Sequence, residues 1–423
     1  MTYDRAVRTR EQLRKLRALL RDDSAETVAQ GVALARSLGP KAQAKMLEGC
    51  RLDALGRPEL GPFFRAPDAL APQLLHAFLA IAPHVAEETA RDDSLRAPEM
   101  LELDGERLPR WPDDLGAWEP SVVVLQLRRC WLRALPPFAL RLPALRGLHL
   151  DHNQLEALPD LSGLAALRHL RLRHNRLRAL EEDALPAGLE QLDLRDTALR
   201  ALPRSLGRLD ALRELWVSGG QLETVPAELG DCAALRELAL TGVGLRAVPR
   251  SLGRLGQLRT LDLSDNELAR LPDELGACAA LEDLDVGRNQ LLQLPASLGR
   301  LARLRRLRAG FNRLTRLPAE LGEAKALRLL AVPSNPITRL PSAQEGGLGG
   351  LRHLDVSRTH LDALDLEAFP RLTTLLANDT PLIALHGLEG ASRLRQLEAR
   401  NAPLDAATRS ALTSREGLQL ALG

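Results

Sequence analysis

Residues 261–295 read LDLSDNELARLPDELGACAALEDLDVGRNQLLQLP, and one pattern occurs twice within this stretch. Residues of the first copy return 23 positions later: Leu261 as Leu284, Asn266 as Asn289, and Pro272 as Pro295. In LDL and LDV, apolar residues flank a polar one, which predicts a short strand with one buried face. Because one copy cannot bury its own leucines, the duplication predicts repeats that stack on one another.

The same pattern continues along most of the chain at spacings of 21 to 24 residues. Counting the first residue of LxxLxL as position 0, its fourteen starts are Pro98, Val122, Leu145, Leu167, Leu189, Leu212, Leu235, Leu258, Leu281, Leu304, Leu327, Leu351, Leu372 and Leu394. Asn recurs at position 8, where its side chain is predicted to bond the backbone of a turn. The following LPxxLGxL predicts a stop and a short helical segment on the opposite side of the repeat.

The pattern LxxLxLxxNxLxxLPxxLGxLxx resembles the 23-residue leucine-rich repeat of intracellular proteins similar to the Ras-suppressor group, over about three quarters of the chain. The resemblance implies a curved α/β solenoid. A parallel sheet would line its concave face, with short helices, 3-10 turns and loops on the convex face. It also implies a non-enzymatic scaffold that binds a protein partner on the concave face, as in signal transduction.

The repeats define the expected domains. Residues 98–423 are predicted to form a solenoid of about 14 repeats, ending in a truncated strand in which Leu418 and Leu420 close the sheet. Residues 1–97 lack the period and are predicted to form an all-α N-terminal cap, because a solenoid exposes its core at both ends. The expected helices are residues 2–20, 26–38, 42–52 and 68–90.

Composition and apolar runs indicate the kind of source genome and the expected location of the protein. Only four of its 57 basic residues are lysines, and this arginine excess beside abundant Ala, Leu and Gly is typical of a GC-rich, bacterial genome. No apolar run reaches the ~20 residues that span a bilayer, and the N-terminus has no apolar signal core. We expect a cytoplasmic protein, with a monomer favoured, while secretion without a leader stays open.

The cysteine positions and the sequence motifs argue against an enzyme. Cys232 and Cys278 occupy a core position and lie two repeats apart, too far for a disulfide. Cys130 takes the place of the turn Asn, and Cys50 is expected to be a buried helical thiol rather than a nucleophile. No nucleotide-binding, hydrolase or zinc-protease motif occurs. We therefore expect no enzyme activity and no cofactor.

A basic strip is predicted on the early repeats. Its residues are Arg128, Arg129, His149, His152, His169, Arg171, Arg173 and His174. Two histidines and Asp196 in one column could hold a divalent metal. The arginines would repel a cation, so the sequence favours a solvated strip without metal. The strip also leaves open polyanion or nucleic-acid binding, although acidic residues interrupt it and stacking aromatics are scarce.

The later repeats place an aromatic residue and changes of charge sign at strand positions expected on the concave face. We predict that a partner contacts these residues: Trp216, Glu214, Glu237, Asp262, Asp265, Asp283, Asp285, Arg306, Arg308 and Phe311. A large aromatic flanked by opposite charges is typical of a binding anchor. A third possibility is a host-targeted effector whose repeats recruit a substrate, but the chain has no segment of catalytic size beside them.

Overall fold

A computed structural model describes most of the repeat region. The described residues are 51–52, 58–59, 100–102, 104–105, 120, 122–222, 224–342, 344 and 347–422. The chain forms two compact units: unit 1 is residues 1–177 with 184–189, and unit 2 is residues 178–183 with 190–423. Except for residues 51–52, the predicted helices of residues 1–97 lie outside the described residues, as does Cys50.

Unit 1 contains a parallel sheet of successive repeats, in the order β3-β4-β5-β6. Its strands are β3 (Met100–Glu102), β4 (Val124–Gln126), β5 (Gly147–His149) and β6 (His169–Arg171), and a 3-10 helix, η2 (Pro137–Arg141), follows β4. Leu125, Leu148 and Leu170 pair in register and are fully buried. The core of this unit is therefore a column of leucines, one from each repeat.

Unit 1 also holds a short antiparallel pair, β1 (Arg51–Leu52) with β2 (Pro58–Glu59). The prediction of a helix through residue 52 is wrong at its last two residues, which are strand. Pro58 opens β2, a position that a strand tolerates because the missing N–H removes only a terminal donor.

Unit 2 continues the same architecture with eleven strands in one parallel sheet, in the order β7-β8-β9-β10-β11-β12-β13-β14-β16-β18-β19. They are β7 (Gln191–Leu194), β8 (Glu214–Ser218), β9 (Glu237–Thr241), β10 (Thr260–Asp262), β11 (Asp283–Asp285), β12 (Arg306–Arg308), β13 (Leu329–Ala331), β14 (His353–Asp355), β16 (Thr374–Leu376), β18 (Gln396–Ala399) and β19 (Gln419–Leu422). Across the described residues, each of the fourteen predicted repeat starts is followed by a strand.

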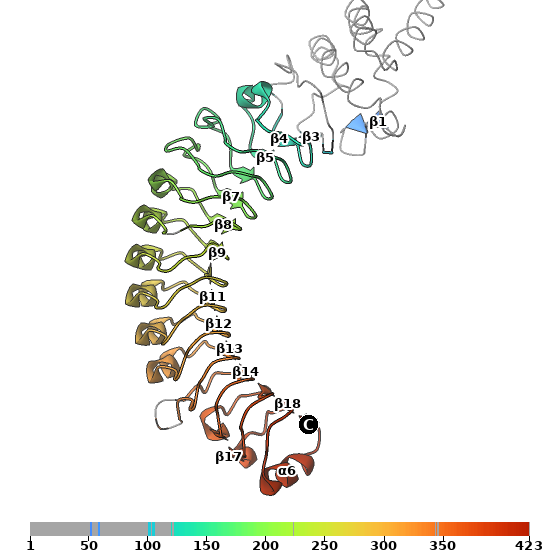
Figure 1. The fold of residues 1–423 in the computed structure, drawn as a ribbon, viewed down its shortest axis with the longest axis vertical. Coiled ribbons are helices and arrows are strands. Elements are labelled where there is room, and N and C mark those ends of the chain that lie inside the picture. Colours follow the sequence, from blue (N-terminus) through green and yellow to red (C-terminus); the bar gives the residue numbers. More distant parts are fainter. Residues whose placement is uncertain are drawn as a thin grey trace, which may run out of the picture. The chain divides into compact units, whose positions relative to one another are not determined.

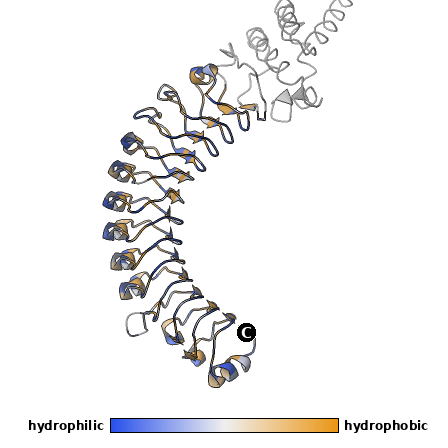
Figure 2. Ribbon diagram, in the orientation of Figure 1, coloured by the Kyte–Doolittle hydropathy of each residue, from blue (hydrophilic) through white to orange (hydrophobic). Residues whose placement is uncertain are grey.

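Within unit 2 the strands line the inner side of the curve and short helices line the outer side (Figure 1). The outer elements are the 3-10 helices η3 (Arg204–Arg208), η4 (Ala227–Asp231), η5 (Arg250–Arg254), η6 (Asp273–Ala277), η7 (Ala296–Arg300), η8 (Ala319–Glu323), η10 (Leu366–Ala368) and η11 (Leu388–Gly390). Proline precedes each of η3 to η8, since its fixed φ suits the residue before a helix. Hydrophobic residues recur in every coil of the unit (Figure 2).

The turn asparagines join neighbouring repeats, as their recurrence predicted. Asn289 is 8% exposed, and its Nδ2 donates to the carbonyls of Val286 in its own turn (3.1 Å) and Leu263 in the preceding repeat (2.9 Å). Its Oδ1 accepts from the N–H of Leu268 (3.0 Å). Each asparagine of this kind therefore satisfies buried backbone groups of two repeats at once.

Where threonine replaces this asparagine, the turn is bonded differently. Thr359 Oγ1 donates to Val356 O (2.6 Å), and Thr380 Oγ1 donates to Ala377 O (2.8 Å). Both acceptors lie in the same turn as the threonine. Among the described residues, these side chains close their own turn and make no hydrogen bond to the preceding repeat.

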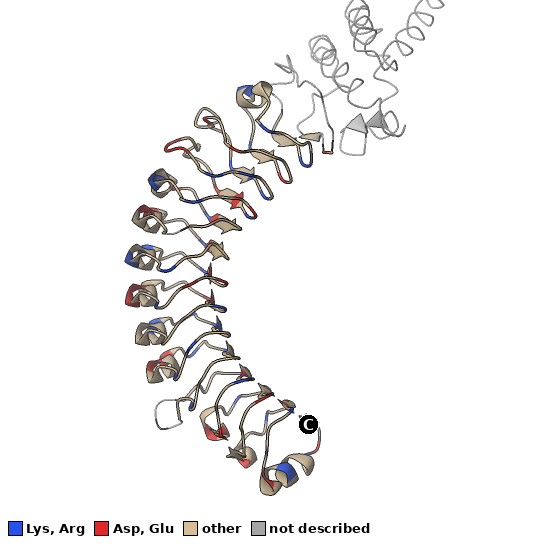
Figure 3. Ribbon diagram, in the orientation of Figure 1, with Lys and Arg blue, Asp and Glu red and all other residues tan. Residues whose placement is uncertain are grey.

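The convex helices η3 to η8 of unit 2 alternate in charge (Figure 3). η3 and η5 carry arginines at both ends, whereas η4 and η6 carry acidic residues. Ion pairs join neighbours, as between Arg254 and Asp231 (2.8 Å) and between Arg250 and Glu274 (3.6 Å). These exposed pairs add little stability individually, but from η3 to η8 each helix faces a neighbour of opposite sign.

The C-terminal repeats depart from the shared pattern. Two of these repeats add a separate parallel pair of strands, β15 (Ala363–Asp365) and β17 (Ala384–His386). The helix α6 (Ala406–Thr413) is capped by Asp405, whose carboxylate accepts from Thr408 N. β19 pairs with β18, which places Leu420 beside Leu397, while Leu418 precedes the strand and is half-buried.

In the described part of the chain, no helix is both long and apolar enough to cross a bilayer.

Candidate recognition face

The strands of unit 2 present one face to the core and one to the concave side. In β10, the middle residue Leu261 is fully buried, and its neighbours Thr260 and Asp262 are half-buried. Because successive residues of a strand point to opposite faces, positions 2 and 4 of each repeat form outward columns about 4.8 Å apart. We call the outward side chains of β8 to β12 and of the turns that follow them the recognition face.

Trp216, in β8, is held rather than freely exposed. Its side chain is half-buried, and its indole Nε1 donates to Glu237 Oε1 on β9 (2.6 Å). The Arg195 guanidinium lies 5.4 Å from the ring centroid and is itself bonded to Asp193 (2.5 Å). A tryptophan fixed in this way offers a large rigid contact at a small cost in conformational entropy.

The acidic centre of the face contains two adjacent carboxylates. Asp262 and Asp285 are paired in register on β10 and β11. Each accepts a bond from the main chain two residues later, Ser264 N (2.9 Å) and Gly287 N (2.9 Å), respectively. Burial raises the pKa of Asp285, and the charges of Asp262 and Asp283 add to this effect. A cation from a partner would relieve this repulsion.

Arg306 and Arg308 do not stand free, because both bind the carboxylate of Asp283. The distances are 2.6 Å from Arg306 Nε and 3.0 Å from Arg308 Nη1. The Asp283 side chain is only 14% exposed, whereas the two arginine side chains are 52% and 42% exposed. One carboxylate therefore orients two cations toward the concave side, and Asp285, in register with Arg308, places a second carboxylate beside them.

Phe311 ends the face on the turn after β12. Its side chain is 45% exposed, and the Arg288 guanidinium lies 4.6 Å from its ring centroid. Arg288 also approaches Asp265 (3.7 Å), so Asp265, Arg288 and Phe311 form a row across three successive repeats. All three have a left-handed backbone, with φ of 58°, 53° and 57°.

The structure brings most of the predicted partner-binding residues onto this face and shows which of them are hydrogen-bonded to one another. Glu214 accepts from Gln191 Nε2, and Glu237 accepts from Trp216, so both carboxylates are engaged within the sheet. The sequence analysis missed the positioning roles of Arg195 and Asp283. For Asp283 the available signal was that Arg306 occupies the same position of the next repeat, because column neighbours lie within reach of one another. Arg195 and Trp216 occupy different repeat positions, so their contact had no such signal.

The basic strip lies in unit 1 and is less basic than its composition suggests. Arg128 bonds Asp104, with Nε 2.6 Å from Oδ2. Burial, together with the charges of Arg171 and Arg128, lowers the pKa of His149 to about 4. His149 is therefore neutral at pH 7. The exposed cationic part of the strip is carried by Arg129, Arg171 and Arg173.

The histidine column in unit 1 is a stack. The rings of His152 and His174 lie 4.3 Å apart at 28°, and burial followed by the charge of His174 lowers the pKa of His152. His169 is exposed on β6. Within the described residues, no group of three or more His, Cys, Asp or Glu side chains is arranged to hold a metal ion.

The cysteines of the repeats fill core positions, as predicted. Cys232 and Cys278 are fully buried free thiols whose Sγ atoms donate to Leu206 O (3.1 Å) and Leu252 O (3.3 Å). Burial raises the pKa of Cys232 to about 12 and that of Cys278 to about 11. Neither thiol forms a thiolate near neutral pH, which excludes both as nucleophiles.

Comparison with known proteins agrees with this architecture. Profiles described as leucine rich repeat and leucine-rich repeat region match residues 120–177 and 245–378, respectively. No curated protein sequence is significantly similar to the chain. Many solved structures share the fold, and three of them indicate its range.

A leucine-rich repeat protein from Leptospira interrogans is 23% identical, with a TM-score of 0.64, over 79% of this chain and 97% of that one. YopM, a leucine-rich effector protein from Yersinia pestis, is 25% identical, with a TM-score of 0.59, over 83% and 93%. A chain from the octameric complex of latrophilin 3, Unc5D and the leucine-rich repeats of FLRT2 is 22% identical, with a TM-score of 0.53, over 69% and 86%. The chain therefore carries leucine-rich repeats and adopts the leucine-rich repeat fold.

Proposed function

We propose that the protein is a non-enzymatic scaffold that binds a protein partner on the recognition face of unit 2. The observation that carries the proposal is the fixed tryptophan. Trp216 is held by Glu237 and Arg195 in an outward column, and an acidic pair and two oriented arginines follow on the next strands. Fixed aromatic and arginine side chains are the residue types that dominate binding energy at protein interfaces.

Two general observations support this proposal. The leucine-rich repeat fold commonly mediates protein–protein interaction, and one similar fold occurs in a chain from a multi-protein receptor complex. The alternation of acidic and basic columns also suits a partner of complementary pattern, because such patterns fix register and exclude wrong partners. We further propose that the repeats are of the 23-residue class and act in the bacterial cytoplasm, with residues 1–97 as a separate cap.

Site-specific photo-crosslinking tests the face directly. A photoreactive phenylalanine analogue would replace Trp216 or Phe311 in the full chain, which is then incubated with lysate of the source cells and irradiated. The matched control carries the analogue at Leu292, an apolar side chain that is 61% exposed and lies outside the strands. We expect one protein to be crosslinked from both concave positions and not from Leu292. Equal labelling from all three positions, or none, would contradict the proposal.

A second candidate function is polyanion binding by unit 1. The observation in its favour is the exposure of Arg129 and, two repeats later, of Arg171 and Arg173. Binding of a single-stranded oligonucleotide should then weaken by at least ten-fold between 50 and 200 mM salt, since each phosphate contact releases a counterion. Salt-independent binding, or no binding at 50 mM salt, would remove this candidate.

A further inference from the structure

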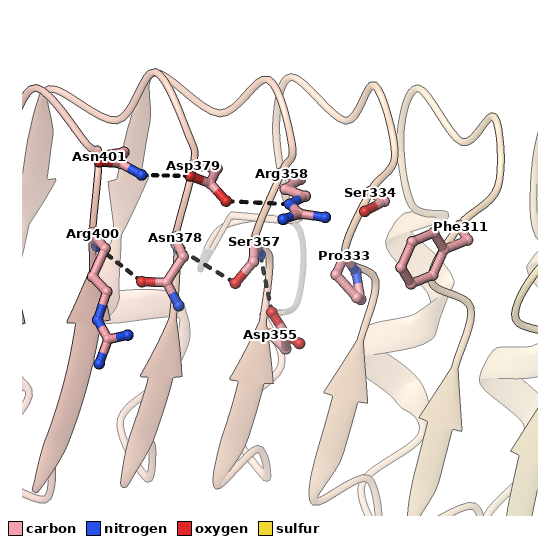
Figure 4. A pocket seen from close by; sticks show the side chains of 10 residues that line it. All are labelled: Phe311, Pro333, Ser334, Asp355, Ser357, Arg358, Asn378, Asp379, Arg400 and Asn401. Atoms are coloured by element: carbon pink, nitrogen blue, oxygen red, sulfur yellow. Dashed lines mark hydrogen bonds and ion pairs between the residues drawn. The ribbon is translucent and has the colours of Figure 1, made fainter.

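A hollow lies on the C-terminal repeats of unit 2 and begins at Phe311, where the recognition face ends. Its volume is about 470 Å³, within the range of ligand-binding clefts. The residues that line it come from five successive repeats: Phe311, Pro333, Ser334, Asp355, Ser357, Arg358, Asn378, Asp379, Arg400 and Asn401. Figure 4 shows these side chains along the turns at the carboxyl ends of the strands.

One end of the hollow is apolar. Phe311 is 45% exposed, and Pro333 lies beside it in the next repeat (Figure 4). Arg288 covers the ring from the preceding repeat, with its guanidinium 4.6 Å from the ring centroid. The uncovered side of the Phe311 ring and the Pro333 ring therefore form a wall against which an apolar side chain can pack.

The opposite end carries a cation without a counter-charge. The Arg400 side chain is exposed, and its guanidinium makes no hydrogen bond or ion pair with any other residue that the structure describes. Its main-chain N–H donates to Asn378 Oδ1 (2.9 Å), which fixes the backbone from which the side chain extends. The neighbouring cation, Arg358, is already bonded to Asp379 (3.2 Å).

The charge of Asp379 is satisfied within the hollow. Its carboxylate also accepts from Asn401 Nδ2 (2.8 Å), and the bonds from Asn401 and Arg358 lower its pKa. The row Asn401–Asp379–Arg358 is thus internally neutral (Figure 4). Arg400 is left as the group that gains most from an anionic ligand, and a guanidinium suits a carboxylate best because it can form two parallel bonds.

The middle of the hollow matches a peptide backbone. Asp355 accepts from Ser357 N (3.0 Å) through one carboxylate oxygen, and its other oxygen is available to accept from a ligand N–H. Ser357 Oγ accepts from Asn378 N (3.2 Å), so its hydroxyl hydrogen is available to donate to a ligand carbonyl. One acceptor and one donor, two residues apart in the same repeat, are complementary to the N–H and C=O groups of an extended chain.

We propose that this hollow binds an extended peptide segment of a partner protein, with an apolar side chain against Phe311 and Pro333 and a carboxylate against Arg400. The inference rests on the proposed protein-binding function but names a different subsite. Phe311 and Arg400 lie four repeats apart, about 19 Å at a strand spacing of about 4.8 Å. An extended chain advances about 3.3 Å per residue, so the apolar and acidic side chains should be about six residues apart.

A displayed library of random decapeptides, selected on the full-length protein, is the probe. We expect the enriched sequences to pair an aromatic or aliphatic residue with Asp or Glu five to seven positions away. A synthetic peptide of this type should bind at least ten-fold more weakly to the Arg400→Glu variant, as measured by fluorescence anisotropy. Exchanging the acidic residue of that peptide for Lys should restore binding to Arg400→Glu but not to the wild type.

The control is Arg393→Glu, which makes the same charge change at an exposed position seven residues before Arg400 and outside the hollow. It should leave peptide binding unchanged, and both variants should melt at the wild-type temperature. Phe311→Ala should weaken the peptide by at least five-fold. Enrichment of sequences without an acid, no enrichment, or equal binding by Arg400→Glu would each overturn the proposal.

The same peptide separates this inference from the proposed function. Trp216→Ala should leave peptide binding unchanged, because Trp216 does not line the hollow. A partner crosslinked from Trp216 together with no selected peptide would retain the recognition face and reject the hollow. A selected peptide that depends on Arg400, with no crosslinking from Trp216, would retain the hollow and reject the recognition face.

Discussion

Two adjoining stretches of unit 2 close their strand turns differently. From β10 to β13, Asn266, Asn289, Asn312 and Asn335 occupy the turn, and the strands are three residues long. In β8 and β9, Gly220 and Val243 occupy the same position, and the strands are five residues long. There the backbone ladder extends to Ser218 and Thr241. A repeat can thus be joined to its neighbour by an asparagine side chain or by a longer backbone ladder.

Exchanging the two turn types should have the largest effect on stability. Asn289→Gly removes bonds to Leu263, Val286 and Leu268 and leaves their buried groups unpaired, so we expect a loss of about 3 kcal/mol. The reciprocal Gly220→Asn should cost about 2 kcal/mol or more, because a Cβ there would overlap Leu199 O. Urea unfolding measures both losses. If Gly220→Asn were neutral, the two turn types would be interchangeable and the comparison would fail.

The next test concerns the 3-10 helices on the convex side, whose glycines pack against the main chain of the next repeat in both stretches. A Cβ on Gly276 would overlap the main-chain oxygen of Ser297 in the next repeat. We expect Gly276→Ala to destabilise the protein by about 2 kcal/mol. The control is Gly256→Ala, where a Cβ meets no atom within 4 Å. A similar melting temperature for the two variants would contradict this account of repeat stacking.

The pH dependence of stability distinguishes the asparagine-bonded repeat of Asn153 in unit 1 from those of unit 2. In unit 1, the repeat of Asn153 also carries His149, whose pKa is lowered to about 4 in the folded state. As pH falls from about 6.5 to about 4, the unfolded chain binds a proton that the folded chain does not, so stability decreases. After allowance for partial exposure, we expect a loss of about 1 kcal/mol.

His149→Gln should reduce this acid-dependent loss, whereas His360→Gln, at an exposed position in unit 2, should not. Melting temperatures at pH 7.0 and 4.5 provide the measurement. An identical pH dependence in His149→Gln and the wild type would show that His149 is not the titrating group.

The smallest expected effect is a gain in stability. Ser251 and Ser297 occupy the same position two repeats apart, but only Ser251 Oγ donates to the preceding repeat, at Ala227 O (2.6 Å). Ser297 is 8% exposed, and its Oγ is a buried polar atom without a hydrogen-bond partner in the described structure. We expect Ser297→Ala to stabilise the protein by about 0.5 kcal/mol and Ser251→Ala to destabilise it. Equal melting shifts would disprove the distinction.

The repeat phase could be predicted from the sequence because it depends on local spacing. Leucines at positions 0, 3 and 5 located the strands, and the Asn and Pro positions located the turn and the 3-10 helix. The longer strands β8 and β9 were less predictable, since their length depends on what the next repeat offers to pair with. The β15–β17 pair likewise forms only between two repeats that both lack the usual Pro-Leu-Gly helix.

The candidate face could be predicted only as a set of positions. The alternation of the strands placed Trp216 and Asp262 on the outward side, but not the bond from Trp216 to Glu237. Likewise, sequence could not show that Arg306 and Arg308 share Asp283, because rotamers decide which of several nearby charges form a pair. The hollow between Phe311 and Arg400 depends on side chains of five repeats and has no signature in any one of them.

The most direct test of the recognition face is a binding titration with the crosslinked partner, once purified. The variant Trp216→Ala/Arg308→Ala removes the fixed aromatic and one of the two oriented arginines, while Arg306 still pairs with Asp283. Its matched control, Leu292→Ala/Arg371→Ala, changes exposed residues away from the face. With equal melting temperatures, we predict that Kd rises about 30-fold or more for the first variant, corresponding to about 2 kcal/mol, and stays unchanged for the control. An unchanged Kd for Trp216→Ala/Arg308→Ala would contradict the account.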